Sequence, residues 1–214
     1  MWRFVIIVFA GLWLSGCAVS PALLPDKPTD NVRPDSAATP PDPKHFDVLA
    51  RFSLVYQTQE DWHGPRISHY SGRLHWRRKG DTDQLRIFSP FGKTLAELHL
   101  RPDLARLQQA DGQITQRHGA DAAEELLRVA LGQALPLDAL ANWLFAKADD
   151  ATAMIEHDKT GRVSLIKQKG WRIRYDYVTD RSRSSRMTAL LPSRLYAAYG
   201  DRVDLRMRVE RWGR

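Results

Sequence analysis

The sequence predicts a mainly β (α+β) protein, built on a single antiparallel sheet with helices packed on one face. From about residue 46 onward, apolar residues alternate with polar ones through most of the chain, which is the period of a half-buried strand. Short glycine-containing turns separate these segments, and short joints connect antiparallel neighbours. Two helical patterns interrupt the strands, and this order of elements is typical of helices that cover one face of a sheet.

The strand pattern is clearest at its beginning, where apolar side chains occupy every second position from Val48 to Tyr56. The other expected strands are 70–76, 84–88, 94–100, 105–109, 163–168, 171–178 and 203–209. Because each strand has one apolar face, we expect the sheet to curl and gather its apolar side chains on the concave side. A concave apolar surface is where a greasy ligand would bind.

Both expected helices lie in the middle of the chain. The first is Ala122–Leu131, where Asp121 and Glu124 have the spacing of a capping box and Gly132 provides a stop signal. The second begins at residue 136 or 137 and ends at Phe145, with leucines at helical spacing.

The first sixteen residues have the pattern of a signal peptide. Arg3 precedes an uncharged apolar run from Phe4 to Leu14, which is about half the length that a helical bilayer span needs. The run ends in Leu-Ser-Gly-Cys, which resembles the lipobox of bacterial lipoproteins, with the thiol of Cys17 as the acceptor of a diacylglycerol group. We expect cleavage before Cys17 and its modification by N-acyl and S-diacylglycerol groups. Cys17 is the only cysteine, so the folded part has no internal disulfide.

The segment between Cys17 and the first strand is expected to be an extended tether. It holds prolines at positions 21, 25, 28, 34, 40, 41 and 43 and too few apolar residues to order itself. We therefore divide the chain into a signal peptide (1–16), a lipidated N-terminus and tether (17–45) and a folded domain (46–214). In bacterial lipoproteins, Asp after the modified cysteine is the signal for retention in the inner membrane. Ala18 stands here, which implies a lipid anchor on the periplasmic face of the outer membrane.

Charge and motif content exclude several classes of function. The net charge of +7 favours anionic headgroups or an acidic partner, and the export signal argues against nucleic acid. The most basic segment, Arg181–Arg186, is interpreted as a solvated loop. The sequence has no Gly-x-Ser-x-Gly, no His-Glu-x-x-His and no glycine-rich phosphate loop, and its histidines lack metal-site spacing. We therefore expect no enzyme activity, no cofactor and no metal.

From Phe52 onward, the order of motifs resembles the LolB family of outer-membrane lipoproteins. The segments that carry the resemblance are Phe52–Tyr56, Ser71–Trp76, Leu85–Leu95, Leu135–Leu144, Gly170–Tyr175, Leu191–Leu195, Leu205–Val209 and Trp212. The resemblance implies a half-open β-barrel of about eleven antiparallel strands, with helices as a lid over an apolar cavity. The family also carries a helix ahead of its first strand. Here Pro40-Pro41-Asp42-Pro43 leaves little room for it, so we expect that helix to be shortened.

The resemblance also implies a function and a set of site residues. The protein would be a monomer that accepts client lipoproteins from the periplasmic carrier LolA, binds their acyl chains and inserts them among outer-membrane lipids. The expected cavity-lining residues are Leu54, Leu74, Trp76, Leu98, Leu140 and Leu144. The alternative function is a structural or lipid-binding outer-membrane lipoprotein that transfers nothing.

Phe91 is the expected membrane-insertion residue. It lies in the turn Ser89-Pro-Phe-Gly92, where the family projects an apolar side chain from a loop. On physical grounds alone, Phe91 could equally fold back onto the edge of the sheet as a plug.

Overall fold

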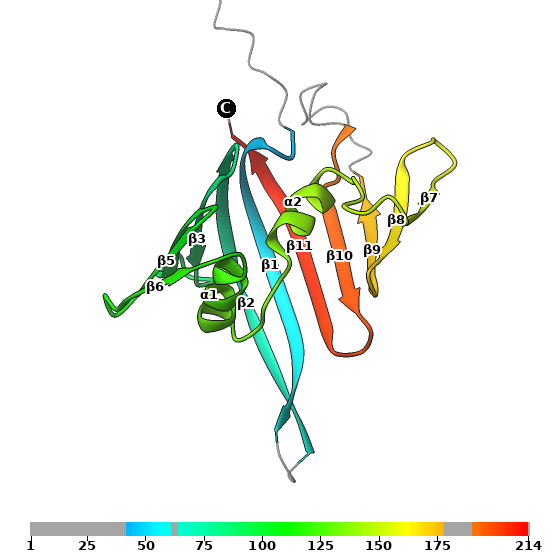
Figure 1. Cartoon of the computed structure of the whole chain (residues 1–214). Coiled ribbons are helices and arrows are strands. Elements are labelled where there is room, and N and C mark those ends of the chain that lie inside the picture. Colours follow the sequence, from blue (N-terminus) through cyan, green and yellow to red (C-terminus); the bar gives the residue numbers. More distant parts are fainter. Residues whose placement is uncertain (1–41, 61–63, 178–189, 214) are drawn as a thin grey trace, which may run out of the picture. The chain divides into compact units, whose positions relative to one another are not determined.

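The computed structural model describes residues 42–60, 64–177 and 190–213. The expected signal peptide, Cys17, the expected tether up to residue 41 and the basic segment Arg181–Arg186 lie outside the described residues. Residues 38–214 form one compact unit. Its described part is an eleven-stranded antiparallel sheet with two helices on one face (Figure 1).

The elements follow each other along the chain as a meander, two helices and a second meander. They are β1 (His45–Glu60), β2 (Gly64–Lys79), β3 (Thr82–Phe88), β4 (Thr94–Arg101), β5 (Leu104–Gln109), β6 (Ile114–His118), α1 (Ala122–Leu131), α2 (Leu137–Leu144), β7 (Met154–His157), β8 (Val163–Gln168), β9 (Trp171–Asp176), β10 (Arg194–Tyr199) and β11 (Val203–Trp212).

The strand order explains why the helices lie over the concave face. The order is β6-β5-β4-β3-β2-β1-β11-β10-β9-β8-β7, so β6 and β7 form the two outer edges and do not pair with each other. The chain between these edges must cross the open side of the curved sheet, and α1 and α2 lie in that crossing (Figure 1). This confirms the expected half-open barrel with helices over its open side.

Regular alternation builds the core between the sheet and the helices. In β3, for example, Asp83, Leu85 and Ile87 are buried while their neighbours Gln84 and Arg86 are exposed. The buried hydrophobic residues of the described chain lie between Phe46 and Met207, so this part of the chain contains its own core.

Glycine fixes the end of α1 against the sheet. Gly132 ends α1 with a φ of 76°, in the left-handed region that favours glycine. A Cβ at this position would lie 1.8 Å from the hydroxyl oxygen of Tyr56 on β1. A side chain at residue 132 would therefore have to displace the Tyr56 ring or the end of α1, so the backbone angle and the close approach both favour glycine here.

Several local expectations were incomplete. Strands β6, β7 and β10 were not predicted, and β1 and β2 are longer than expected. The expected capping box is wrong, because the Asp121 side chain makes no capping hydrogen bond to α1. Of the segment before β1, the structure describes residues 42–44, a bridge residue and a turn, with no helix among them.

Candidate functional site

A wholly apolar cavity of about 30 Å³ lies between the sheet and the two helices. Four strands (β1, β2, β3 and β11), both helices and the segment between the helices contribute its wall. The lining residues are Phe52, Leu74, Leu85, Ile87, Leu127, Leu131, Leu135, Leu137, Leu140, Leu205 and Met207. Such a wall favours hydrocarbon and offers a polar ligand no hydrogen bond.

The cavity is too small to hold an acyl chain in this conformation. A single water-sized sphere needs roughly 10–15 Å³, so about 30 Å³ takes only two or three of them. An acyl chain would therefore need α1 and α2 to move away from the sheet. Leucine side chains from α1 and α2 close one side of the cavity, so such a movement would enlarge it without breaking the sheet.

The six expected cavity residues divide into two groups. Leu74 on β2 and Leu140 on α2 line the cavity. The other four, Leu54, Trp76, Leu98 and Leu144, are at most 1% exposed and belong to the surrounding core. All six therefore face the interior between sheet and helices, and two of them reach the present cavity.

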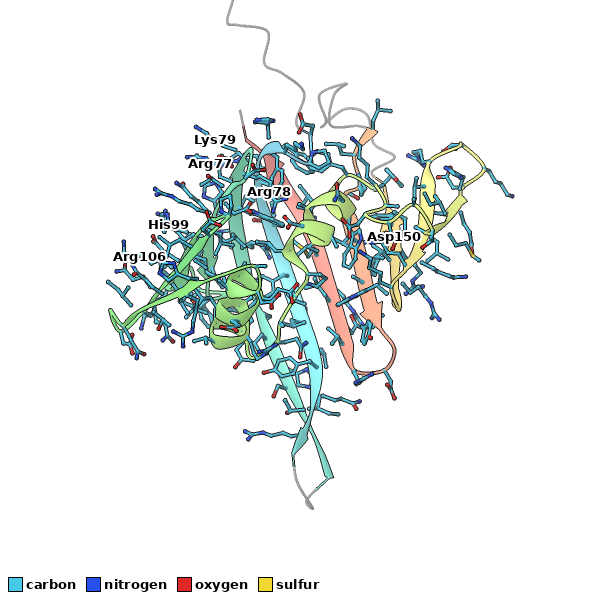
Figure 2. All side chains as sticks on the ribbon, in the orientation of Figure 1. Arg77, Arg78, Lys79, His99, Arg106 and Asp150 are labelled. Atoms are coloured by element: carbon cyan, nitrogen blue, oxygen red, sulfur yellow. The ribbon has the colours of Figure 1, made fainter. Side chains whose placement is uncertain are left out.

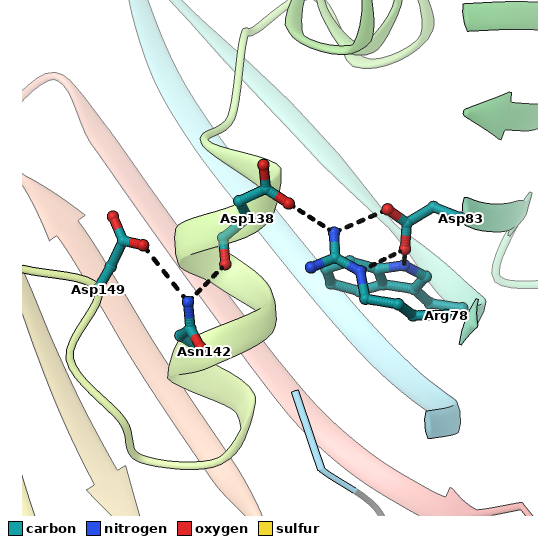
Figure 3. A network of polar contacts seen from close by, with 6 residues as sticks. Arg78, Asp83, Asp138, Asn142 and Asp149 are labelled. Carbon is teal, nitrogen blue, oxygen red and sulfur yellow. Dashed lines mark hydrogen bonds and ion pairs between the residues drawn. The ribbon is translucent and has the colours of Figure 1, made fainter. Parts of the chain in front are cut away.

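A buried ion pair between β2 and β3 lies beside this cavity, and its arginine also contacts α2 (Figure 3). Arg78 on β2 donates two hydrogen bonds of 2.7 Å to Asp83 on β3, with only 9% of the arginine side chain exposed. Arg78 Nη2 also donates to Asp138 in the first turn of α2, at 2.9 Å. Trp76 completes the group, because its Nε1 donates to Asp83 Oδ1 at 2.6 Å. We call Trp76, Arg78, Asp83 and Asp138 the lid anchor.

The electrostatics of the lid anchor favour a charged arginine. Burial lowers the pKa of Arg78, but hydrogen bonds and attraction from Asp83 and then Asp138 raise it above its ordinary value overall. The two carboxylates contribute unequally to stability, because Asp83 is 8% exposed whereas Asp138 is 90% exposed. An ion pair with an exposed partner is worth at most about 1 kcal/mol. Asp83 therefore holds Arg78 in place, and Asp138 forms a weaker link between Arg78 and α2.

A further contact ties α2 to the segment that follows it. Asn142 Nδ2 donates to the backbone oxygen of Asp138 at 3.2 Å and to Asp149 Oδ1 at 3.4 Å (Figure 3). Asp149 also forms an ion pair with Lys169 at 3.3 Å, and Asp150 accepts hydrogen bonds from Thr152. The adjacent carboxylates of Asp149 and Asp150 are thus occupied by contacts within the fold.

Alternation along β2 and β3 carries a signal for the lid anchor. Arg78 continues the inward-facing series of Leu74 and Trp76, and Asp83 begins the inward-facing series of Leu85 and Ile87. A charged residue at a position that alternation assigns to the core needs a partner there. The strand register places Arg78 directly opposite Asp83.

Phe91 projects from the turn between β3 and β4 and is 98% exposed. The turn is closed by hydrogen bonds from Gly92 N to Ser89 O at 2.9 Å and from Ser89 N to Lys93 O at 2.8 Å. Lys93 N also donates to Ser89 Oγ at 3.1 Å. The aromatic ring does not fold back onto the sheet edge, so the turn presents it to the surroundings on a well-ordered support.

Polar and charged side chains cover the outer face of the sheet, among them His99 on β4 and its cross-strand neighbour Arg106 on β5 (Figure 2). On the same face, Asp47 accepts hydrogen bonds from His75 and Arg77 at 2.8 Å each. Burial raises the pKa of Asp47, but these two partners lower it below its ordinary value overall. This face of the described sheet offers no grouping of His, Cys, Asp or Glu that could hold a metal ion, nor does the rest of the described chain.

Two further findings concern the helices and the exposed apolar side chains of the described chain. None of its helices has both the length and the apolar character needed to cross a bilayer. Phe91 is the most exposed of its large hydrophobic side chains.

Comparison with known proteins gives a consistent result. The family profile described as "Outer membrane lipoprotein LolB" matches residues 45–212. The chain is 30% identical over 211 residues to the outer-membrane lipoprotein LolB of Dechloromonas aromatica (strain RCB), which covers 98% of this chain and 96% of that protein. The corresponding protein of Azoarcus sp. (strain BH72) is 32% identical over 143 residues, covering 66% and 69%. That of Bordetella petrii is 37% identical over 111 residues, covering 51% and 54%. These names are those of lipoproteins and not of enzymes, and the chain belongs to the LolB family of outer-membrane lipoproteins.

Proposed function

We propose that this protein is an outer-membrane-anchored receptor that accepts lipoproteins from the periplasmic carrier LolA and inserts them into the outer membrane. It would hold the acyl chains of a client between the sheet and the helices, in the enlarged form of the apolar cavity. Client lipoproteins, LolA and outer-membrane lipids are the proposed partners, and the protein would act as a monomer. Neither a nucleotide nor a catalytic group takes part in this cycle.

The observation that carries the proposal is the wholly apolar cavity under two helices that apolar contacts and two exposed ion pairs, Arg78–Asp138 and Arg117–Glu125, hold to the sheet in the described chain. Each methylene buried from water contributes about 0.8 kcal/mol, so small differences in burial can direct an acyl chain from carrier to receptor to bilayer. The small cavity is consistent with release of the acyl chains into the bilayer, because leucine side chains of α1 and α2 would fill the space once the acyl chains have left. Family membership independently supports an outer-membrane lipoprotein.

The lipid anchor at Cys17 is part of the proposal. We expect Cys17→Ala to leave a folded domain that is no longer acylated, because the chain has no second cysteine that depends on this thiol. Mass spectrometry of the purified protein and its distribution between membrane and soluble fractions are the measurements. Wild-type chain from the same cells is the control, and acylated Cys17→Ala protein would contradict the lipobox assignment.

A transfer assay tests the receptor function. Residues 38–214, which form one compact unit, are incubated with carrier that is loaded with a lipoprotein. We expect the wild-type unit to take over the lipoprotein and Leu74→Glu to take over at least tenfold less. The reason is that a carboxylate at residue 74 would face the apolar cavity without a hydrogen-bonding partner. Co-purification of the lipoprotein with each variant is measured.

The matched control is Gln84→Glu, which adds the same charge on the exposed outer face of β3. Circular dichroism first establishes that both variants are folded. Equal uptake by Leu74→Glu and Gln84→Glu would place the acyl site elsewhere. No uptake by the folded wild-type unit would favour the alternative of a lipoprotein that binds lipid or supports structure without transfer.

A further inference from the structure

Four arginines lie side by side on the outer face of the sheet, one on each of four neighbouring strands. Arg194 on β10 is directly opposite Arg208 on β11. Arg208 is in turn opposite Arg51 on β1, and Arg51 is opposite Arg73 on β2. Residues that are directly opposite each other in an antiparallel pair lie on the same face of a sheet. Each of the four has a buried neighbour along its strand that belongs to the core under the helices, so the arginines point away from α1 and α2. We call these four residues the arginine row.

The arginine row carries more charge than the described residues around it neutralise. Two carboxylates, those of Glu210 and Asp176, form ion pairs with three of the four guanidinium groups. Arg208, the second arginine of the row, is exposed and has no carboxylate partner among the described residues. Like charges that are directly opposite each other destabilise a sheet, so the row lowers the stability of the fold. This cost points to a ligand outside the domain that the charge attracts.

A groove of about 400 Å³ continues this charged surface over β9, β10 and β11. It is lined by Arg174, Tyr196 and Arg206, which form the outward-facing row next to the arginine row. Arg206 forms an ion pair with Asp204 at 2.9 Å. Arg172 also lines the groove and, like Arg174, has no carboxylate partner in the described part of the chain. A guanidinium group presents several N–H donors in a plane that matches the oxygens of a phosphate, so the groove suits a phosphate group.

The composition of this face favours a membrane surface over a protein partner. Protein interfaces concentrate their binding energy in aromatic and other apolar side chains at the centre. Of the exposed large hydrophobic side chains in the described residues, none lies on β1, β9, β10 or β11. Attraction to anionic headgroups needs only the charge. The arginine row also ends near the turn that carries Phe91, because Arg73 is opposite Phe88 and the turn begins at the next residue.

We propose that the outer face of β9, β10, β11 and β1 docks on anionic phospholipid headgroups, with the arginine row and the adjoining groove binding their phosphates. This contact goes beyond the proposed function, because it needs neither the acyl cavity nor the carrier. It is consistent with the membership of the chain in a family of outer-membrane lipoproteins. Docking through charge would hold the domain at the headgroups while Phe91 enters the acyl region.

Binding to vesicles tests the proposal directly. Residues 38–214, which lack Cys17, are sedimented with vesicles of phosphatidylcholine alone or of phosphatidylcholine mixed with phosphatidylglycerol. We expect the wild-type unit to bind the mixed vesicles at least tenfold more tightly, and this preference should decrease as salt is added. Arg208→Gln and Arg174→Gln should each weaken binding to the mixed vesicles about fivefold. That factor corresponds to about 1 kcal/mol, the contribution of one arginine near an anionic surface.

Two further variants separate docking from net charge and from folding. Arg128→Gln removes the same charge from an exposed position on α1 and should bind the mixed vesicles within about twofold of the wild type. Arg208→Glu places a carboxylate between Arg194 and Arg51. Because opposite charges on neighbouring strands attract, we expect this variant to have a higher unfolding midpoint than the wild type and yet to bind the mixed vesicles more weakly than Arg208→Gln. A more stable protein that has lost binding cannot be explained by unfolding.

Three outcomes would overturn the proposal. Equal binding of the wild-type unit to both kinds of vesicle would show that headgroup charge is not recognised. Equal losses for Arg128→Gln and Arg208→Gln would mean that only net charge matters. If Arg208→Gln binds vesicles like the wild type but takes over less lipoprotein from the loaded carrier, the arginine row binds an acidic protein instead. Uptake by the wild-type unit is measured without vesicles, so failure of docking and failure of the proposed function are distinguishable.

Discussion

Replacing Phe91 with glutamate is expected to stop delivery of lipoproteins into membranes while the protein still folds and still accepts them from the carrier. Phe91 is 98% exposed on a turn that its own hydrogen bonds hold, so neither the core nor the cavity loses a contact. Burying one aromatic side chain in the acyl region contributes roughly 2–3 kcal/mol, enough to orient a protein that is already tethered nearby. A carboxylate at the same position would resist entry into the bilayer. The measurement is transfer of a labelled lipoprotein from the purified variant to liposomes.

Phe91→Leu is the matched control for this experiment. Leucine retains an apolar side chain on the same turn, so delivery should remain near the wild-type rate. The unfolding midpoint of both variants should match the wild type. Delivery at the wild-type rate by Phe91→Glu would contradict a role in the membrane, and a large loss of stability would mean that the ring packs on the protein.

The largest expected effect on stability comes from Asp83→Leu. This change leaves the Arg78 guanidinium buried without its main partner and removes the acceptor of Trp76 Nε1. Breaking a buried ion pair by removing one partner costs about 3–5 kcal/mol. We place the effect near 3 kcal/mol, because Asp138 still accepts one hydrogen bond from Arg78. Urea denaturation followed by circular dichroism measures the free energy of unfolding.

Two companion variants separate the contributions within the lid anchor. Arg78→Met combined with Asp83→Leu removes both buried charges and should recover most of the loss, since apolar residues of similar volume can replace a buried pair. Asp138→Asn should cost less than 1 kcal/mol because that carboxylate is 90% exposed. A loss for Asp83→Leu as small as that for Asp138→Asn would contradict the division of roles within the lid anchor.

The sequence predicts this fold well where alternation is strong and poorly where neighbours decide the structure. Leu85 and Ile87 alternate with exposed residues, and β3 was expected almost as it is. In β10, Ala197 and Ala198 are adjacent and too small to mark the two faces, although their pairing with β9 and β11 is regular. In β7 all four residues are exposed, so no inward face exists to produce a pattern. These strands form because a neighbouring strand supplies hydrogen bonds, and the pattern of residues within the strand does not indicate such pairing.

The candidate site was predictable to a similar degree. Alternation places Leu74 on the inner face, where the structure has it. Turn chemistry around Pro90 and Gly92 left the direction of Phe91 open, and the exposed position that the family resemblance favoured is the one in the structure. The actual extent of the cavity depends on how closely α1 and α2 pack on the sheet, which periodicity does not specify.

The position of β11 beside β1 has a consequence for the order in which the molecule can assemble. Val48 is paired with Trp212, so the seam at the centre of the sheet joins the first strand of the domain to the last. Closing a loop that spans the whole domain is entropically the most expensive contact, and folds dominated by such contacts form slowly. Until β11 is available, β1 is an open edge whose inward-facing residues, including Ala50 and Leu54, lack cover on one side. During synthesis, when the N-terminal part of the chain is made first, the two meanders therefore stay separate until β11 is available. Loss of β11 would leave the middle of the sheet unjoined.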